Sequence, residues 1–223
     1  MANYSIAIDG PGGAGKSTIA KIIAKKLGII YIDTGAMYRA VGLFAVRKGI
    51  DTLDSDALKK VIDDIEIDIE NTGGEMHIFL CGEDVSNKIR TPEISMAASN
   101  VARAVPVRLK LVELQRKLAE KTSVIMDGRD IGSYVLPNAD VKIYLTADVE
   151  DRARRRYDEL ILKGSAVKFE DVLEDMKKRD YNDSNREFAP LCKAEDALFV
   201  DTTGLELEES VEKLFNIVMS KIA

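Results

Sequence analysis

The sequence of 223 residues is poor in the two residue types that most often mark metal sites and proton-transfer catalysts. It holds only two cysteines, Cys81 and Cys192, which stand too far apart in the chain for a zinc-binding spacing. We interpret them as reduced thiols of a cytoplasmic protein. His77 is the single histidine, so the chain offers no obvious histidine general base, and we assign it no role.

Long apolar runs, a surplus of positive charge and internal repeats are also missing. No run of apolar residues is long enough to span a bilayer, and a first strand expected from Tyr4 leaves no room for a signal peptide. The net charge of −6 argues against nonspecific binding of nucleic acid or of a membrane surface. We therefore expect a cytoplasmic protein with small-molecule partners, in which any basic site is a local cluster.

Four glycines gather near the start of the chain, in a stretch with the pattern Gly-x-x-x-x-Gly-Lys-Ser. The stretch reads Gly10, Pro11, Gly12, Gly13, Ala14, Gly15, Lys16, Ser17 and Thr18. Such a loop turns its backbone N–H groups towards one point, where a polyphosphate is bound at the start of the following helix. Lys16 adds a positive charge for the outer phosphates, and the Ser17 hydroxyl is placed to bind Mg²⁺. The pattern predicts an ATP-binding phosphate loop.

The segments on both sides of this loop have the patterns that a phosphate loop requires. Residues 4–8 are predicted to form a short buried strand. After the loop, Ile19, Ile23 and Leu27 recur at helical spacing, and Gly28 is expected to end the helix. Strand, loop and helix together favour a phosphate loop over an ordinary glycine-rich turn.

Apolar segments with the length of strands alternate with helical patterns along most of the chain. Further strands are predicted at residues 29–32, 123–127, 141–145 and 198–201. We expect one α/β domain of the P-loop NTPase type, with a doubly wound sheet of about five parallel strands. Right-handed connections place the loops that face the phosphates at one edge of this sheet.

Two segments depart from this alternation. Around Ile65 to Ile69, apolar and acidic residues alternate strictly, and residues 71–74 are typical of a hairpin turn, which predicts a small antiparallel β insert. Further on, Asp148 starts a helix with Arg152, Arg155 and Arg156 on one face, which we interpret as part of a helical lid. A hinge-like break is expected at residues 163–165, followed by a helix over 169–179. The polar segment 179–186 comes next, and it is either an exposed connection or a binding loop. The expected division is a core of residues 1–62, 104–148 and 190–223, an insert of 63–103 and a lid of 149–189.

Charged residues converge on the predicted ligand edge of the sheet. They are the cations Lys16, Arg39, Arg129, Arg179 and Arg186 and the acids Asp127, Asp130 and Asp183. One nucleotide does not need so many arginines, so we infer a second anionic substrate beside the first. The arrangement is typical of a kinase that moves a phosphoryl group between two phosphates, where cations and positioning do most of the work. Asp127 ends a core strand and is expected to hold Mg²⁺ with Ser17.

Several segments resemble the bacterial cytidylate kinase family. They are residues 8–18, 33–39 (Asp-Thr-Gly-Ala-Met-Tyr-Arg), 82–86, 89–91, 127–132 (Asp-Gly-Arg-Asp-Ile-Gly) and 185–190 (Asn-Arg-Glu-Phe-Ala-Pro). The resemblance covers nearly the whole chain and implies a nucleoside monophosphate kinase that phosphorylates CMP and dCMP with ATP and Mg²⁺. It also implies that the β insert belongs to the monophosphate-binding region. We expect a monomer.

By this resemblance, the catalytic group comprises Lys16, Asp127, Arg129, Arg179 and Arg186, and Arg155 joins the phosphate loop in binding ATP. The expected CMP-binding residues are Thr34, Tyr38, Arg39, Ser99, Arg108, Arg129, Asp130, Arg179, Asp183 and Arg186. Within this set Ser99, Arg108 and Asp130 match positions that recognise cytosine. A carboxylate can accept a hydrogen bond from the amino group of this base. Thr34 stands where other members carry serine and keeps the hydroxyl.

Two other functions remain open from the residues alone. A P-loop kinase of another small acceptor, such as UMP or shikimate, has the same phosphate loop. A nucleotide-gated switch is the second alternative, but that class reads guanine through Asn-Lys-x-Asp. Here the corresponding stretch, residues 87–90, ends in Arg90 instead of an aspartate.

Overall fold

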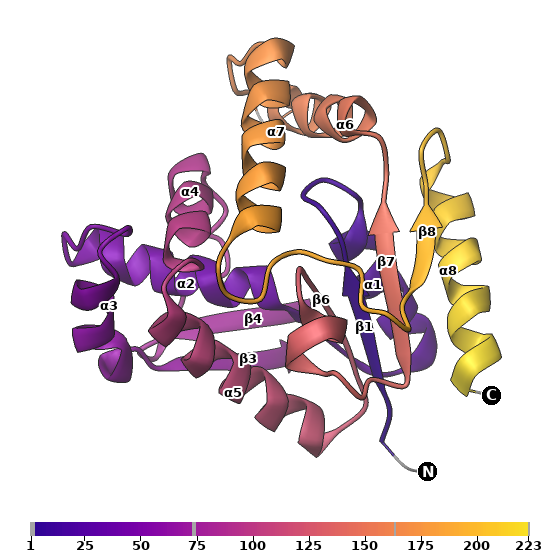
Figure 1. Cartoon of the computed structure of the whole chain (residues 1–223), viewed down its shortest axis with the longest axis horizontal. Coiled ribbons are helices and arrows are strands. Elements are labelled where there is room, and N and C mark those ends of the chain that lie inside the picture. Colours follow the sequence, from indigo (N-terminus) through magenta and orange to yellow (C-terminus); the bar gives the residue numbers. More distant parts are fainter. Residues whose placement is uncertain (1–2, 73–74, 163, 223) are drawn as a thin grey trace. The chain divides into compact units, whose positions relative to one another are not determined.

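The computed structural model describes residues 3–72, 75–162 and 164–222, and its elements are labelled in Figure 1. Within this range the chain divides into two compact units, one formed by residues 29–124 and the other by residues 3–28 and 125–222. The five-stranded sheet has the order β2-β6-β1-β7-β8. Strand β2 belongs to the first unit, and β1, β7 and β8 belong to the second.

The second unit carries the central strands and the phosphate loop. Its elements are β1 (Ser5–Asp9), α1 (Lys16–Leu27), β6 (Val124–Gly128, which begins at the unit boundary), β7 (Val141–Thr146), α6 (Val149–Leu162), α7 (Phe169–Asn185), β8 (Leu198–Asp201) and α8 (Leu207–Ile222). Strand β7 pairs in parallel with β1 and with β8, so that Ile8 lies opposite Ile143 and Leu145 opposite Val200. The parallel arrangement predicted from the alternating segments is confirmed.

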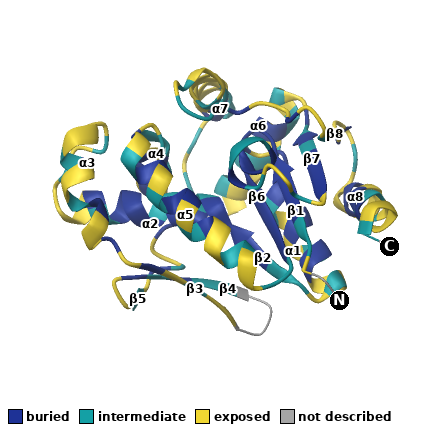
Figure 2. Cartoon of the chain, turned by 60° about the horizontal axis from the view of Figure 1, so that its bottom comes forward, coloured by how far each residue is buried: buried dark blue, intermediate teal, exposed yellow. Residues whose placement is uncertain are grey.

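Apolar side chains of the second unit meet between the sheet and two helices. Ile8 and Ile143 in the strands are at most 1% exposed, and Figure 2 shows β1, β6 and β7 as mostly buried. Helix α1 contacts α8, and each turns a buried face inward, with Ile23 on α1 and Leu214 on α8 fully buried. This core fixes the position of the loop between β1 and α1.

The first unit contains a helical group and a small antiparallel sheet. Its elements are β2 (Ile30–Asp33), α2 (Thr34–Arg47), α3 (Ser55–Val61), a 3₁₀ turn (Ile62–Asp64), β3 (Ile67–Thr72), β4 (Glu75–Leu80), β5 (Glu83–Asp84), α4 (Pro92–Val101) and α5 (Val105–Lys121). Helix α2 begins after Asp33, whose Oδ1 accepts a hydrogen bond from the Ala36 N–H at 2.9 Å. Gly42 lets α2 approach α4 closely, since a Cβ there would lie 3.0 Å from Ala97 Cβ.

The predicted antiparallel insert is present as strands β3, β4 and β5. Ile67 lies opposite Leu80 and Ile69 opposite Ile78, while the predicted turn at residues 73 and 74 lies outside the described residues. His77 Nδ1 lies 3.1 Å from Asp84 Oδ2, a partner that we did not predict. The two compact units divide the chain differently from the predicted core, insert and lid, and that division stays a prediction.

Helix α7 differs from the prediction at its C-terminal end. We expected a helix over 169–179 followed by a loop, but α7 continues to Asn185. The prediction of a loop from Arg179 is wrong because the tertiary contacts of Asp180 and Asp183 outweigh the weak helix propensity of Asp, Asn and Ser. In the hinge predicted before this helix, Lys163 lies outside the described residues.

Candidate functional site

The phosphate loop lies between β1 and α1, as predicted. Its first residue, Gly10, has φ of +149°, and a Cβ placed on it would lie 1.9 Å from the Leu145 carbonyl oxygen. Gly13 and Gly15 also have positive φ, of 76° and 85°. Lys16 is the first residue of α1, so the backbone N–H groups at the start of the helix adjoin the loop. The local geometry is that of an anion-binding loop.

Lys16 is 5% exposed, and its Nζ donates a hydrogen bond of 2.7 Å to the Pro11 carbonyl oxygen. Burial and the nearby Arg129 and Arg179 together lower the pKa of the Lys16 ammonium to about 7. Asp127 and Asp9 act in the opposite direction but do not balance these effects. Positive charge is therefore concentrated beside the loop, in a place where a bound polyphosphate would compensate it.

Ser17 and Asp127 lie together at the other side of the loop. The Ser17 hydroxyl donates a hydrogen bond of 2.8 Å to Asp127 Oδ2, which joins helix α1 to the end of β6. One hydroxyl and one carboxylate form a donor set that suits Mg²⁺, since this ion is usually held by one or two protein oxygens together with substrate phosphates and water. Among the described residues, no group of three or more His, Cys, Asp or Glu could hold a metal ion.

Ion pairs hold the arginines of the second unit in place. Arg129 Nε donates to Asp183 Oδ2 at 2.7 Å, and Arg186 donates to Asp130 Oδ1 at 3.1 Å. Burial alone would raise the pKa of Asp183, but Arg129 and Arg179 outweigh it and hold that pKa below its usual range. These two ion pairs bring Arg129 and Asp130, which follow β6, together with Asp183 on α7 and Arg186 directly after it.

The phosphate loop is in direct contact with two of these arginines. A Cβ placed on Gly12 would lie 3.5 Å from Arg129 Nη2 and 3.8 Å from Arg179 Cδ. Both arginine side chains therefore lie beside the loop backbone at this position. Lys16, Arg129 and Arg179 therefore form one cationic cluster, which we call the loop cluster.

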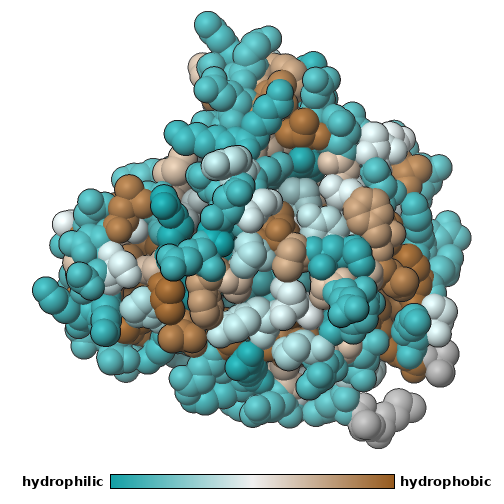
Figure 3. Space-filling model, viewed as in Figure 1, coloured by the Kyte–Doolittle hydropathy of each residue, from teal (hydrophilic) through white to brown (hydrophobic). Residues whose placement is uncertain are grey.

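Arg152 is a contact of the loop that sequence reasoning missed. We counted it with Arg155 and Arg156 on a charged face of the lid helix, but it is 5% exposed. Its Nη1 lies 2.9 Å from the Gly12 carbonyl oxygen and 2.7 Å from Asp180 Oδ2. Met176 of α7 also lies over the loop, since a Cβ on Gly13 would be 3.0 Å from its Cε. Helices α6 and α7 thus cover the loop, and Figure 3 shows the outer surface of this pair as mainly hydrophilic.

Arg155 lies elsewhere on the same helix. Its guanidinium donates a hydrogen bond of 3.3 Å to the carbonyl oxygen of Thr202, in the segment between β8 and α8. No pattern in the sequence distinguished the buried Arg152 from Arg155, because both lie on the same predicted helix face. Only the packing of α6 against α7 separates their surroundings.

The first unit holds the other predicted site residues. Arg39 donates a hydrogen bond of 2.8 Å to Asp33 Oδ2, and its buried Nε has no hydrogen-bond partner among the described residues. The guanidinium of Arg108 lies 5.6 Å from the centroid of the Tyr38 ring, and Arg108 is 1% exposed. Thr34 begins α2 and is buried, and Ser99 lies half-buried on α4. That these residues and those of the second unit form one site stays a prediction.

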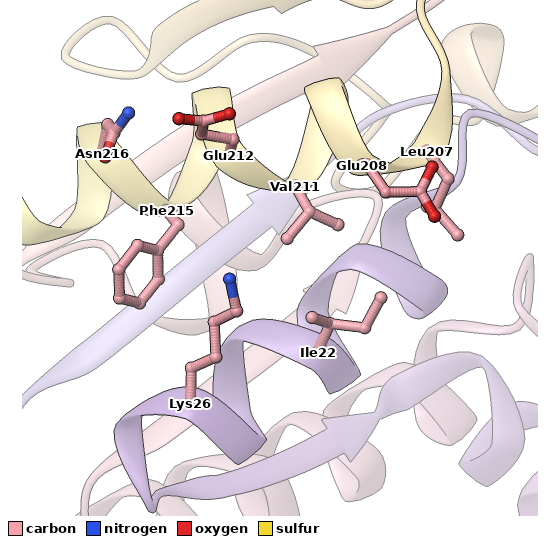
Figure 4. A pocket seen from close by; sticks show the side chains of 8 residues that line it. All are labelled: Ile22, Lys26, Leu207, Glu208, Val211, Glu212, Phe215 and Asn216. Carbon is pink, nitrogen blue, oxygen red and sulfur yellow. The ribbon is translucent and has the colours of Figure 1, made fainter.

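A pocket of about 490 Å³ lies in the second unit, between α1 and α8 (Figure 4). Its walls include Ile22, Val211 and Phe215, and the Lys26 ammonium lies 5.0 Å from the centroid of the Phe215 ring. None of the residues predicted for nucleotide binding lines this pocket. It does not belong to the candidate site.

Comparison with known proteins gives a family match over almost the whole chain. The family model described as cytidylate kinase matches residues 6–220. A curated relative named cytidylate kinase from Clostridioides difficile (strain 630) is 53% identical over 222 residues, which cover 100% of this chain and 99% of the relative. Relatives of the same name from Caldicellulosiruptor bescii and Bacillus subtilis (strain 168) are 51% and 49% identical, and each alignment covers 97% of this chain and at least 96% of the relative.

Solved structures with similar folds are more distant in sequence. A shikimate kinase from Bacteroides thetaiotaomicron has a TM-score of 0.50 at 14% identity, and an uncharacterized protein from Eubacterium ventriosum has a TM-score of 0.55 at 15% identity. Each comparison covers 98% of this chain and 99% of the other. At these identities the likeness shows the fold alone, and it agrees with the predicted α/β fold class. Among the described residues, none of the helices has both the length and the apolar character needed to cross a membrane.

Proposed function

The chain belongs to the cytidylate kinase family, and on that premise we propose how its residues divide the work of the reaction. The enzyme transfers the terminal phosphoryl group of ATP to CMP or dCMP, giving ADP and CDP or dCDP. The observation that carries our assignment of residues is the loop cluster. In an acidic chain with a net charge of −6, Lys16, Arg129 and Arg179 gather at a loop whose backbone is shaped for an anion.

On the donor side, the phosphate loop from Gly10 to Thr18 binds the phosphates of ATP, with Lys16 at the outer phosphates and Arg155 as a further contact. Ser17 and Asp127 would hold Mg²⁺, and the neighbouring hydroxyl and carboxylate oxygens support this assignment. When bound, the ion supplies positive charge that neutralises the negative charge on the transferred phosphoryl group. A phosphate acceptor is already largely ionised near neutral pH, so no general base is required. The residues of the site need only position the two substrates and neutralise the charge of their phosphates.

On the acceptor side, we propose that two sets of residues bind CMP. The contributing residues are Thr34, Tyr38, Arg39, Ser99 and Arg108 of the first unit and Arg129, Asp130, Arg179, Asp183 and Arg186 of the second. The buried Nε of Arg39, without a partner among the described residues, supports an anionic ligand there.

The small-molecule substrates require no partner chain, and we propose that the enzyme acts as a monomer in the cytoplasm. The free and exposed thiols of Cys81 and Cys192 agree with a reducing compartment. An ADP-release assay with CMP, dCMP, UMP, AMP, GMP and shikimate tests the substrate assignment. Turnover confined to an acceptor other than a cytidylate would reject it.

Replacing Asp130 by alanine tests the reading of the base. Asp130 is 4% exposed, and its carboxylate is a suitable acceptor for the amino group of cytosine, which uracil lacks. We expect Asp130→Ala to lower kcat/KM for CMP by about 10- to 100-fold, matching a lost contact of about 1–3 kcal/mol, and to lower it less for UMP. Steady-state kinetics with both acceptors measure the ratio. The exposed Asp175→Ala on α7 is the control, and equal losses for CMP and UMP would show that Asp130 does not read the base.

Removal of divalent metal tests the proposed ion site. With excess EDTA we expect turnover to fall to background and to return on addition of Mg²⁺, because the charge on the phosphates is then neutralised again. The Ser17→Ala and Asp127→Asn variants should require higher Mg²⁺ concentrations for half-maximal turnover than the unaltered enzyme. Unchanged Mg²⁺ dependence in both variants would place the ion elsewhere.

A further inference from the structure

Asp9 is a buried carboxylate to which the assignments above give no role. It is the last residue of β1, it is 4% exposed, and it directly precedes the first glycine of the phosphate loop. Its Oδ1 accepts a hydrogen bond of 2.7 Å from the Ile131 N–H, and its Oδ2 accepts one of 2.7 Å from the Gly132 N–H. Each oxygen thus holds one backbone donor of a segment more than 120 residues away in sequence.

The surroundings of Asp9 disfavour its charge. Burial and the nearby Asp130 raise the pKa of Asp9 to about 6, although the two N–H donors and Lys16 act in the opposite direction. On β7, Tyr144 also lies in the field of Asp9, while Lys142 Nζ is bonded to Asp196. A neutral side chain would cost less to bury here, so the presence of a carboxylate calls for a functional reason.

The two N–H groups belong to a turn that begins directly after two predicted site residues. The Asp130 carbonyl oxygen accepts hydrogen bonds from Tyr134 N–H at 2.9 Å and from Val135 N–H at 3.0 Å, which closes a wide turn over Ile131–Val135. The first two N–H groups of this turn are the ones that Asp9 binds. Its carboxylate therefore fixes the start of the turn, as a capping side chain does at the start of a helix.

The same turn fixes the backbone position of the two residues that precede it. Arg129, which pairs with Asp183, and Asp130, which pairs with Arg186, lie in the two positions before Ile131. A shift of the turn would move the backbone of both residues relative to the phosphate loop. Displacements of about 1 Å at a site of phosphoryl transfer can lower the rate about 100-fold.

We propose that Asp9 is a positioning residue of the transfer reaction, which fixes Arg129 and Asp130 relative to the phosphate loop by binding the N–H groups of Ile131 and Gly132. The proposal rests on the site roles proposed above for Arg129 and Asp130. In this role Asp9 acts through the backbone of the turn, to which both of its oxygens are bonded. Because it adjoins Gly10, the donor loop and the acceptor-side arginine share one anchoring point.

The test is the nearly isosteric Asp9→Asn variant. The amide offers one acceptor oxygen instead of two, and its NH₂ group then faces a backbone N–H, so one of the two bonds is lost. We expect kcat with CMP to fall about 10- to 100-fold and KM for CMP to rise severalfold. The affinity for ATP, titrated without an acceptor, should change less than twofold. A loss of ATP affinity as large as the loss in kcat/KM for CMP would overturn the proposal, and so would unchanged kinetics.

Asp140→Asn is the matched control for this variant. Asp140 is exposed, and its Oδ2 accepts a backbone hydrogen bond of 2.8 Å from Ser5 at the opposite end of β1. It binds the same strand through the same kind of bond but lies outside the proposed site. Its kinetic constants should therefore remain those of the unaltered enzyme.

A double-mutant cycle separates the new role from the proposed site itself. If Asp9 acts through the turn, adding Asp9→Asn to the combined Arg129→Ala and Asp130→Ala variant should lower kcat/KM for CMP little further, because both side chains that it positions are then absent. Fully additive losses would overturn the proposal. If Asp130→Ala and Arg129→Ala leave turnover intact, the proposed site is wrong. If they impair turnover while Asp9→Asn does not, only the role of Asp9 is rejected.

Hydrogen exchange provides a measurement that needs no variant. In the unaltered protein, the amide protons of Ile131 and Gly132 should exchange as slowly as those of the core strands, because a buried carboxylate holds both. If Asp9→Asn fails to fold, this measurement still shows whether Asp9 holds the turn in the unaltered protein. Exchange at the rate of an unstructured peptide would show that Asp9 does not hold the turn.

Discussion

Replacing Lys16 by alanine is expected to lower kcat about 100- to 1,000-fold with every acceptor, the range found when one preorganised charge donor is removed from a transition state. Lys16 lies at the start of α1 within the loop cluster, where it serves the phosphates of the donor. Its loss should therefore affect CMP, dCMP and UMP by the same factor. Steady-state kinetics with the three acceptors measure this factor.

The stability of the same variant provides the sharper comparison. Burial and the neighbouring Arg129 and Arg179 lower the pKa of Lys16 to about 7, so the charged ammonium is disfavoured in the protein without ligands. Because the side chain does not stabilise the fold by its charge, we expect Lys16→Ala to unfold at the same urea concentration as the unaltered enzyme or at a higher one. Lys25→Ala, which removes an exposed lysine from the same helix, is the control for both measurements. A variant that loses stability and activity in parallel would contradict a role of Lys16 in catalysis.

Replacing Gly10 by alanine is expected to lower the free energy of unfolding by about 4 kcal/mol or more, at the extreme of single substitutions. The new Cβ would lie 1.9 Å from the Leu145 carbonyl oxygen, a distance that no relaxation of a side chain can relieve, because the obstacle is backbone of the central strand β7. The φ of +149° adds strain for any residue with a side chain. Urea unfolding followed by circular dichroism gives the value.

Gly28→Ala separates the collision from the backbone strain. Gly28 also has a positive φ, of 67°, at the end of α1, but nothing lies within 4 Å of the Cβ that alanine would add. We expect this variant to lose only about 1–2 kcal/mol, the cost of the left-handed conformation. Equal losses for Gly10→Ala and Gly28→Ala would mean that the contact with Leu145 is not what restricts position 10 to glycine.

The parts of the fold that the sequence predicted are those in which local pattern and burial agree. The glycines and Lys16 of the phosphate loop define a backbone shape by themselves, and the strands beside it are short apolar runs in the core of the sheet. The alternation around Ile67 and Ile69 identifies β3 because one face of that strand is buried and the other is wet. In each case a few neighbouring residues are sufficient to determine the structure.

The missed parts depend on contacts between distant segments. The last turns of α7 contain Asp180, Asp183 and Asn185, which favour a loop by propensity, and the helix persists there because Asp180 and Asp183 pair with Arg152 and Arg129. No sequence pattern singled out Asp9, since its two N–H partners follow 122 and 123 residues later. Such a partnership leaves no periodic signal in one sequence.

The cover over the phosphate loop has a consequence for the catalytic cycle. Arg152 joins the Gly12 carbonyl oxygen to Asp180 on α7, and Met176 lies against Gly13, so that both long helices rest on the loop. We expect ATP to reach the loop backbone, and ADP to leave it, only when these contacts separate. We therefore expect each turnover to include one breaking and one remaking of the ion pair between Arg152 and Asp180, which makes nucleotide exchange a gated step with its own rate.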